Sequence, residues 1–171
     1  MEYFKILTQS NNNIERFSDK YKMKFERMIV SKSGYCFGIS YTPNHYSKFL
    51  VQNGIIDLFI KESIKQLLMN NWRFEQLLEY SDALQMDIVD CTVKDIELDE
   101  LLEDEIISRE YLLDYLIDNE NEIMKMKFRT KEQYLVILMN NGVIGVDEEL
   151  IEEDSLVIPR LLDFVSYGKV F

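Results

Sequence analysis

Residues 130–146, TKEQYLVILMNNGVIGV, carry the signals of two different structures, so this stretch decides how much sheet the second half of the chain contains. Thr130 and Gln133 have the spacing of a helix capping box, and Gly142 follows the apolar run as a helix-ending glycine does. Asn141 and Gly142, between YLVILM and VIGV, also form a dipeptide typical of a tight β-hairpin. We expect a helix here and keep the hairpin as the alternative.

Period-two patterns on either side of this stretch predict strands. They are EYFKIL (2–7), DIVDCTV (87–93) and MKMKFR (124–129). In DIVDCTV we expect Val89, Cys91 and Val93 to share one face. A hairpin is predicted between MKFERMIV (23–30) and YCFGISY (35–41), because the apolar residues of the second run alternate and Gly34 supplies turn geometry.

Helical spacing is clearest in IIDLFIKESIKQLL, residues 55–68. Its expected buried face consists of Ile56, Phe59, Ile60, Ile64, Leu67 and Leu68. Further helices are predicted for WRFEQLLEY (72–80), for the region of Leu98 to Ile106 and for REYLLDYLID (109–118). The tail after residue 148 ends with an apolar stretch that we expect to pack on the body of the protein.

These patterns predict an α+β fold, helix-rich, with a small and mostly antiparallel sheet packed against several helices. At 171 residues and 47% apolar composition the chain is expected to form a single globular domain over residues 1–171. Two lobes, 1–86 and 87–171, are compatible with this expectation. Residues 42–56 and 130–144 also share six residues in register, and whether they record an internal duplication stays open.

The negative charge is concentrated in the second half of the chain. The net charge is −12, and residues 1–86 are near neutral with 11 Lys and Arg against 9 Asp and Glu. Residues 87–171 carry 8 against 22. Clustered phosphates are bound by clustered Lys and Arg, so direct binding of nucleic acid by this half is not expected.

The densest acidic run is DIELDELLEDE, residues 95–105, with seven carboxylates in eleven positions. Its leucines recur at helical spacing, so they predict a buried stripe that leaves the carboxylates facing solvent. A second run, DEELIEED, begins at Asp147. As partner-binding residues we predict Glu97, Glu100, Glu103, Asp104, Asp147, Glu148, Glu152 and Glu153.

Signals for catalysis and for bound groups are weak. The single histidine, His45, has no second histidine beside it, and Cys36 and Cys91 are too far apart for a zinc motif. With six glycines and no phosphate-binding loop, a nucleotide site is not expected. The acidic runs lack the tight glycine turn of a calcium site. We therefore predict no catalytic, cofactor or metal residue, and we expect the two thiols to be free and buried.

Charge and size together favour a small acidic cytoplasmic binding protein that neutralises a basic protein partner. Immunity proteins, antitoxins and nucleic-acid-mimicking inhibitors, typically from bacteria or phage, act in this way, although no motif places the chain in one of these families. The alternatives are a carboxylate-dependent hydrolase and a self-associating structural subunit, with a homodimer as one form. The longest apolar run, YLVILM, is far shorter than the roughly 20 residues of a membrane-spanning helix, so no membrane is expected.

Overall fold

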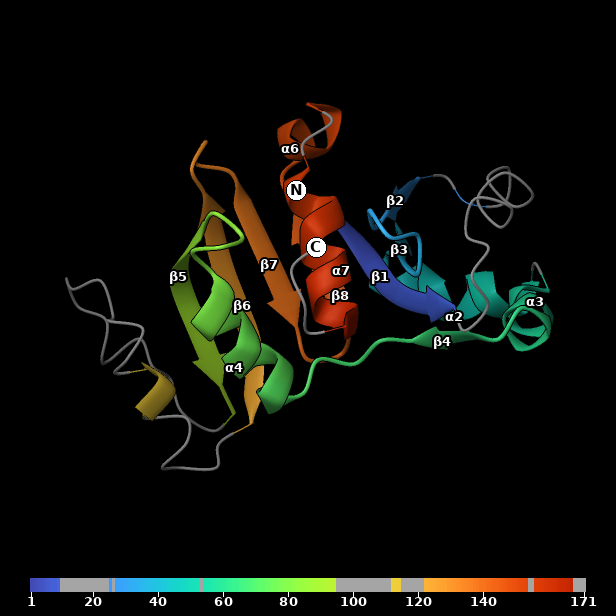
Figure 1. Ribbon diagram of the computed structural model, residues 1–171. Coiled ribbons are helices and arrows are strands. Elements are labelled where there is room, and N and C mark those ends of the chain that lie inside the picture. The colour runs from blue at the N-terminus through green and yellow to red at the C-terminus, as the bar shows by residue number, and fades with distance from the viewer. Residues whose placement is uncertain are drawn as a thin grey trace.

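The computed structural model describes residues 1–9, 25, 27–52, 54–94, 112–114, 122–153 and 156–167. The strands are β1 (Glu2–Gln9), β2 (Met28–Val30), β3 (Cys36–Ser40), β4 (Ile64–Gln66), β5 (Met86–Val93), β6 (Ile123–Thr130), β7 (Leu135–Met139) and β8 (Val143–Val146). The helices labelled in Figure 1 are α2 (Pro43–Gln52), α3 (Ile55–Lys61), α4 (Asn71–Tyr80), α6 (Glu148–Glu152) and α7 (Val157–Tyr167).

All eight strands belong to one antiparallel sheet (Figure 1). Its order is β2-β3-β1-β8-β7-β6-β5, and β4 pairs with the end of β1 beside that path. The expected small sheet in a helix-rich fold is therefore wrong, since strands and helices take up about equal shares of the described residues. The α+β mixture and the antiparallel pairing were predicted correctly.

The prediction of a helix over 130–146 is the main cause of this error. The segment forms β7 and β8, whose hairpin places Val136 opposite Val146, and β7 also pairs with β6 on its other side. Gly142 supplies the turn with a φ of 74°. The supposed capping box lies in the β6–β7 turn, where the Thr130 hydroxyl accepts the Tyr134 N–H. Partners on both edges thus override the helical signal.

The helix predicted for residues 55–68 is only half correct. It ends at Lys61, and Ser63, with a φ of 54°, redirects the chain into β4. The expected buried face is shifted as a result: Ile60 is 73% exposed, whereas the neighbouring Leu58 is buried. Residues 64–66 instead pair with β1, which places Ile64 in the smaller hydrophobic cluster.

Other strand predictions are confirmed with one local exception. β1, β6 and the β2–β3 hairpin form as expected, and so does the helix α4. In β5 a register irregularity between Ile88 and Asp90 turns Val89 to solvent, while Cys91 and Val93 are buried. The two segments compared for duplication, 42–56 and 130–144, adopt different structures. The first contains the helix α2, whereas the second contains the strand β7 and the turns on either side of it.

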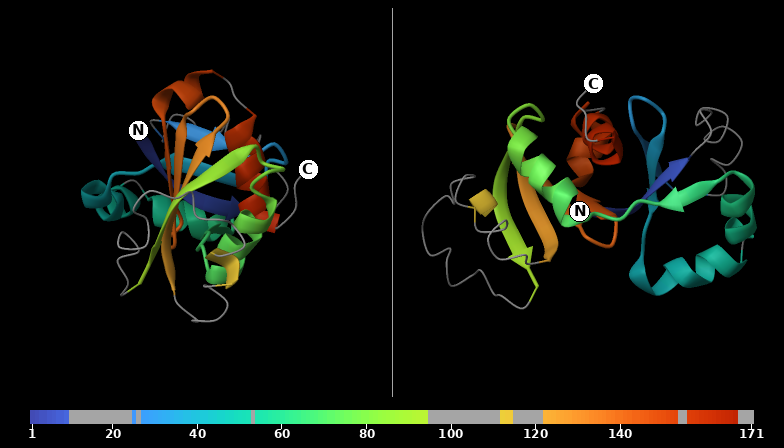
Figure 2. Two further views of the ribbon diagram at one scale, coloured as in Figure 1. Left: turned by 90° about the vertical axis from the view of Figure 1, so that its left-hand side faces the viewer. Right: turned by 60° about the horizontal axis from the view of Figure 1, so that its bottom comes forward.

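Two hydrophobic clusters lie on opposite faces of the sheet. β1 alternates between them: Phe4 and Ile6 belong to the larger cluster, and Leu7 belongs to the smaller one. α4 and α7 cover the first face, whereas α2 and α3 pack on the other face beside β1 and β3 (Figure 2). As expected, the C-terminal segment packs on the body through the buried side of α7.

Two predicted helices fall mainly outside the described residues. The helix around Leu98 to Ile106 lies there entirely, and of 109–118 only the helical turn 112–114 is described, with Leu112 buried. In the described part of the chain, no helix has the length and apolar character needed to cross a membrane.

Candidate protein-binding surface

The predicted partner-binding residues fall into two groups. Glu97, Glu100, Glu103 and Asp104 lie outside the described residues. Asp147, Glu148, Glu152 and Glu153 form or flank α6, directly after β8. Because Val146 lies opposite Val136, the end of β8 and the start of β7 share one end of the sheet. The topology therefore brings the β6–β7 turn next to α6.

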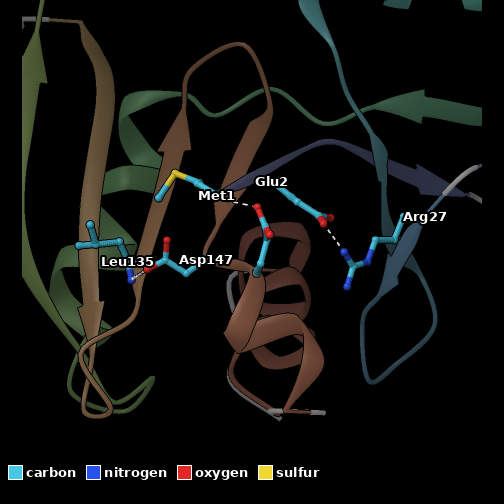
Figure 3. A network of polar contacts seen from close by, with 6 residues as sticks. Met1, Glu2, Arg27, Leu135 and Asp147 are labelled. Carbon is cyan, nitrogen blue, oxygen red and sulfur yellow. Dashed lines mark hydrogen bonds and ion pairs between the residues drawn. The ribbon is translucent and has the colours of Figure 1, made fainter.

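Asp147 has a structural role in this arrangement. Its carboxylate accepts the Leu135 N–H at 2.7 Å, and its own N–H donates to the Leu135 carbonyl at 3.2 Å (Figure 3). These two bonds tie the start of α6 to β7. A carboxylate used in this way has less capacity to bind a partner than its neighbours, so we leave Asp147 out of the surface defined below.

Two ion pairs lie at the start of β1, and one of them involves α6. The Met1 amino group lies 3.2 Å from the Glu148 carboxylate, and the Arg27 guanidinium pairs with Glu2 (Figure 3). Arg27 directly precedes the edge strand β2. Its positive charge is thus balanced within the fold, next to the edge of the sheet.

The other side of α6 carries carboxylates around a tyrosine. The Tyr134 hydroxyl donates a hydrogen bond of 2.6 Å to Glu153. This bond is the largest cause that raises the pKa of Tyr134, followed by desolvation and by the charges of Glu153, Glu149 and Glu132. Tyr134 is therefore close enough to these three glutamates to be affected by their negative charges.

We call Glu132, Glu149, Glu152 and Glu153 the α6 acidic surface. All four are exposed, and within the described residues no Lys or Arg forms an ion pair with any of them. Glu132 and Glu149 were missed as site residues by sequence reasoning. The hairpin alternative for 130–146 was the signal for Glu132, because only a hairpin brings the β6–β7 turn to α6.

An open pocket lined by apolar side chains, called the apolar pocket below, lies on another side of α6. It has a volume of about 200 Å³ and is enclosed by β2, α6 and the first turn of α7. Its lining consists of Met28, Ile29, Val30, Leu150, Ile151, Ile158 and Pro159. No ionisable side chain belongs to this lining, so the pocket supplies neither a general acid nor a general base.

The thiols are placed for packing. Cys36 and Cys91 are free and buried in the larger hydrophobic cluster. Burial is the main cause that raises the pKa of both, to about 12 for Cys91. A thiol reacts as its thiolate, so neither side chain is activated as a nucleophile. Among the described residues, no group of three or more His, Cys, Asp and Glu side chains is arranged to hold a metal ion.

A buried lysine is the most unusual cation of the described core. Lys5 is 5% exposed, and its ammonium donates to the Asn141 carbonyl at 2.5 Å. The same ammonium lies 5.5 Å and 5.9 Å from the ring centroids of Tyr41 and Tyr46. Desolvation lowers the pKa of Lys5, while burial and the neighbouring Tyr41 raise that of Tyr46 to about 12. These contacts stabilise the join between β1 and the β7–β8 turn.

Comparison with models of known protein families, with curated proteins and with solved structures finds no match to this chain.

Proposed function

We propose that the protein is a small acidic binding protein that neutralises a basic protein partner. The observation that carries the proposal is the α6 acidic surface, four exposed glutamates at one end of the sheet with no cation paired to them in the described residues. Carboxylates that are not paired within the fold are available to Lys and Arg of another molecule. The cytoplasm is the compartment in which we place this interaction, and immunity proteins, antitoxins and nucleic-acid-mimicking inhibitors are the functional classes that it fits.

Charge of one sign gathered on one surface acts mainly on the rate of encounter. Such a field raises the association rate with an oppositely charged protein by roughly 10- to 1000-fold at low salt. The seven carboxylates of residues 95–105 add to the same sign of charge. The concentration of acid in the second half of the chain therefore favours fast capture of a basic protein.

Tyr134 supplies a second property that a protein interface needs. It is an aromatic side chain beside the α6 acidic surface, and its hydroxyl donates a hydrogen bond to Glu153. Tyrosine and tryptophan dominate the binding energy of many interfaces because a rigid ring buries a large area at a small entropic cost. Tyr134 is thus the expected anchor, and the glutamates around it are the expected source of charge complementarity.

The alternative of a carboxylate-dependent hydrolase needs two carboxylates in one cavity. The side chains that line the pocket beside α6 are all apolar and include no carboxylate, and the glutamates of the α6 acidic surface are exposed. Binding is for this reason the function that the geometry supports best.

The test is capture of the partner from cells that carry the gene, with the tagged chain as bait. The wild-type chain is expected to retain a basic protein. A triple variant, Glu149→Gln with Glu152→Gln and Glu153→Gln, should retain much less of it. The control removes three other carboxylates of the described fold through Asp57→Asn, Glu75→Gln and Asp87→Asn, and it should behave as wild type. Equal loss in both variants would point to net charge alone, and a retained partner that is acidic would refute the proposal.

A further inference from the structure

The strand β2 is an edge of the sheet, and its outer side offers backbone groups for pairing. The Ser31 N–H donates to the Cys36 carbonyl, and the Ser40 N–H donates to the Arg27 carbonyl, so residues 27 and 31 face β3. Because backbone direction alternates along a strand, the N–H and C=O groups of Met28 and Val30 point away from β3. In the described part of the chain nothing is bonded to these groups.

One end of this free edge is closed by α7. The next outward N–H, that of Lys32, donates to the Pro159 carbonyl at 3.4 Å. The open part therefore comprises Met28, Ile29 and Val30. The same three residues form one wall of the apolar pocket, whose other walls are α6 and the first turn of α7. An unpaired strand edge and an apolar pocket thus occur side by side.

The size of the pocket indicates what fits it. Sites for small molecules usually measure about 300 to 1,000 Å³, and this pocket, at about 200 Å³, is smaller. It suits one large apolar side chain. Residues directly opposite each other on paired strands point to the same face, so a side chain across from Ile29 would enter the pocket. Pairing with backbone groups and filling of a side-chain pocket are together the features of β-strand addition.

We propose that an extended segment of the basic partner adds antiparallel to β2 and places one apolar side chain in the pocket between β2, α6 and α7. The inference rests on the proposed function and names the part of the partner that docks. Side chains two positions from the apolar one point to the same face of the sheet as the pocket, and α6 beside the pocket carries the exposed Glu152. Lys or Arg is the residue type that suits those positions. The nearby Arg27 does not oppose such a segment, because it is paired with Glu2.

The probe is a synthetic peptide, acetyl-Thr-Lys-Thr-Leu-Thr-Lys-Thr-amide, titrated into the isotope-labelled full chain. The leucine is the pocket residue, and the two lysines lie two positions from it. The largest shifts are expected at the amides of Met28 and Val30, which should also become protected from hydrogen exchange. A peptide with serine in place of leucine and one with glutamate in place of lysine should each bind at least about tenfold more weakly.

A pair of variants separates edge pairing from simple contact. Val30→Pro removes an N–H that points away from β3, at a position where proline is tolerated in an edge strand, together with the valine side chain. It should weaken peptide binding by about tenfold or more, as expected for a lost backbone hydrogen bond. Val30→Thr keeps the N–H and the β-branched shape and should bind as wild type.

Modified peptides make the same test without changing the protein. In an antiparallel addition with leucine opposite Ile29, the threonines beside the leucine exchange hydrogen bonds with Met28 and Val30. N-methylation of one of these threonines should abolish binding, whereas N-methylation of the leucine should have little effect.

The outcomes distinguish this inference from the proposed function. Absence of peptide binding, or binding that Val30→Pro leaves unaltered and that shifts only residues of α6, would overturn the inference while leaving capture of a basic protein intact. If the Val30→Pro effect persists but the triple glutamine variant binds the peptide equally well at all salt concentrations, docking at β2 stands and the role of the α6 acidic surface fails.

Discussion

Asp163 and Ser33, 130 residues apart in the chain, join α7 to the tip of the β2–β3 hairpin. The Asp163 carboxylate is 1% exposed and accepts the Ser33 N–H at 3.0 Å through one oxygen and the Ser33 hydroxyl through the other. The bond from the Lys32 N–H to the Pro159 carbonyl lies beside this contact. The position of the edge strand relative to α7, and with it the shape of the apolar pocket, depends on this buried carboxylate.

Replacing Asp163 by alanine should lower the free energy of unfolding by about 2 kcal/mol, because two donors of Ser33 lose a charged acceptor. The cost is moderated by the exposure of Ser33, which lets water reach its freed groups. Asp163→Asn keeps one acceptor oxygen and should cost less. Denaturant unfolding of both variants measures the difference. A wild-type stability for Asp163→Ala would show that the hairpin tip is held by other contacts.

Gly142 is a second position at which a small change should have a large effect. Its φ is 74°, and a Cβ atom placed there would lie 1.8 Å from the Leu67 carbonyl oxygen. Gly142→Ala should therefore cost more than about 4 kcal/mol or prevent folding. Gly54→Ala is the matched control, with a φ of 62° and open space around the Cβ, and should cost about 1 to 2 kcal/mol. Similar melting temperatures for the two variants would contradict the close approach at Gly142.

The same glycine shows where sequence reasoning failed. Asn141-Gly142 was recognised as a hairpin signal, but the capping-box spacing of Thr130 and Gln133 was given more weight. What decides the structure is pairing of β7 with both neighbouring strands, β6 and β8, and a capping-box spacing carries no information about such pairing. The prediction of one helix over residues 55–68 failed for a similar reason, since residues 64–66 form β4 by pairing with β1.

The candidate site was predictable only in part. The acidic run from Asp147 is visible in the sequence because charge is a property of composition, and in the structure it forms α6 and its flanks. The roles within it depend on the topology: Asp147 is used by Leu135, and Glu132 reaches α6 from a distant turn. The pocket beside β2 is lined by residues 28–30 and by residues between 150 and 159, so no local sequence pattern predicts it.

Alkaline pH should destabilise the fold through Cys91. Burial raises the pKa of this thiol from 9.0 to about 12, so the folded state holds its proton where the unfolded chain has lost it. The contribution of Cys91 to the free energy of unfolding is fully present below pH 9. It is lost as the pH rises from there toward 12, by up to about 1.4 kcal/mol per pH unit. Cys91→Ala should flatten this part of the profile. Unfolding measured at pH 8, 9 and 10 tests it, and an equal slope in both proteins would assign the loss to other groups.

Glu153→Gln should lower the pKa of Tyr134, because it removes both the charge and the strongest acceptor at its hydroxyl. Glu152→Gln is the matched control: Glu152 lies on the same helix but is not among the causes of the shift, and it should have little effect. Titration of the tyrosine ring by NMR measures both. An equal decrease in the two variants would mean that Tyr134 senses the general charge of α6 and not the contact with Glu153.

The last prediction concerns which acidic segment meets the basic partner. With the captured partner purified, the triple glutamine variant of α6 should associate about tenfold more slowly at low salt, and this difference should shrink as salt screens the charges. Dissociation should change little, since exposed charges act mainly on encounter. The comparison variant neutralises Glu97, Glu100, Glu103 and Asp104 instead, which removes four charges from the other acidic run. If only this second variant slows association, recognition belongs to residues 95–105 and the role given to the α6 acidic surface must be withdrawn. If both slow it, the partner is attracted by the combined field of the two segments. An unchanged association rate and salt dependence in both would mean that the carboxylates are only a solvated surface.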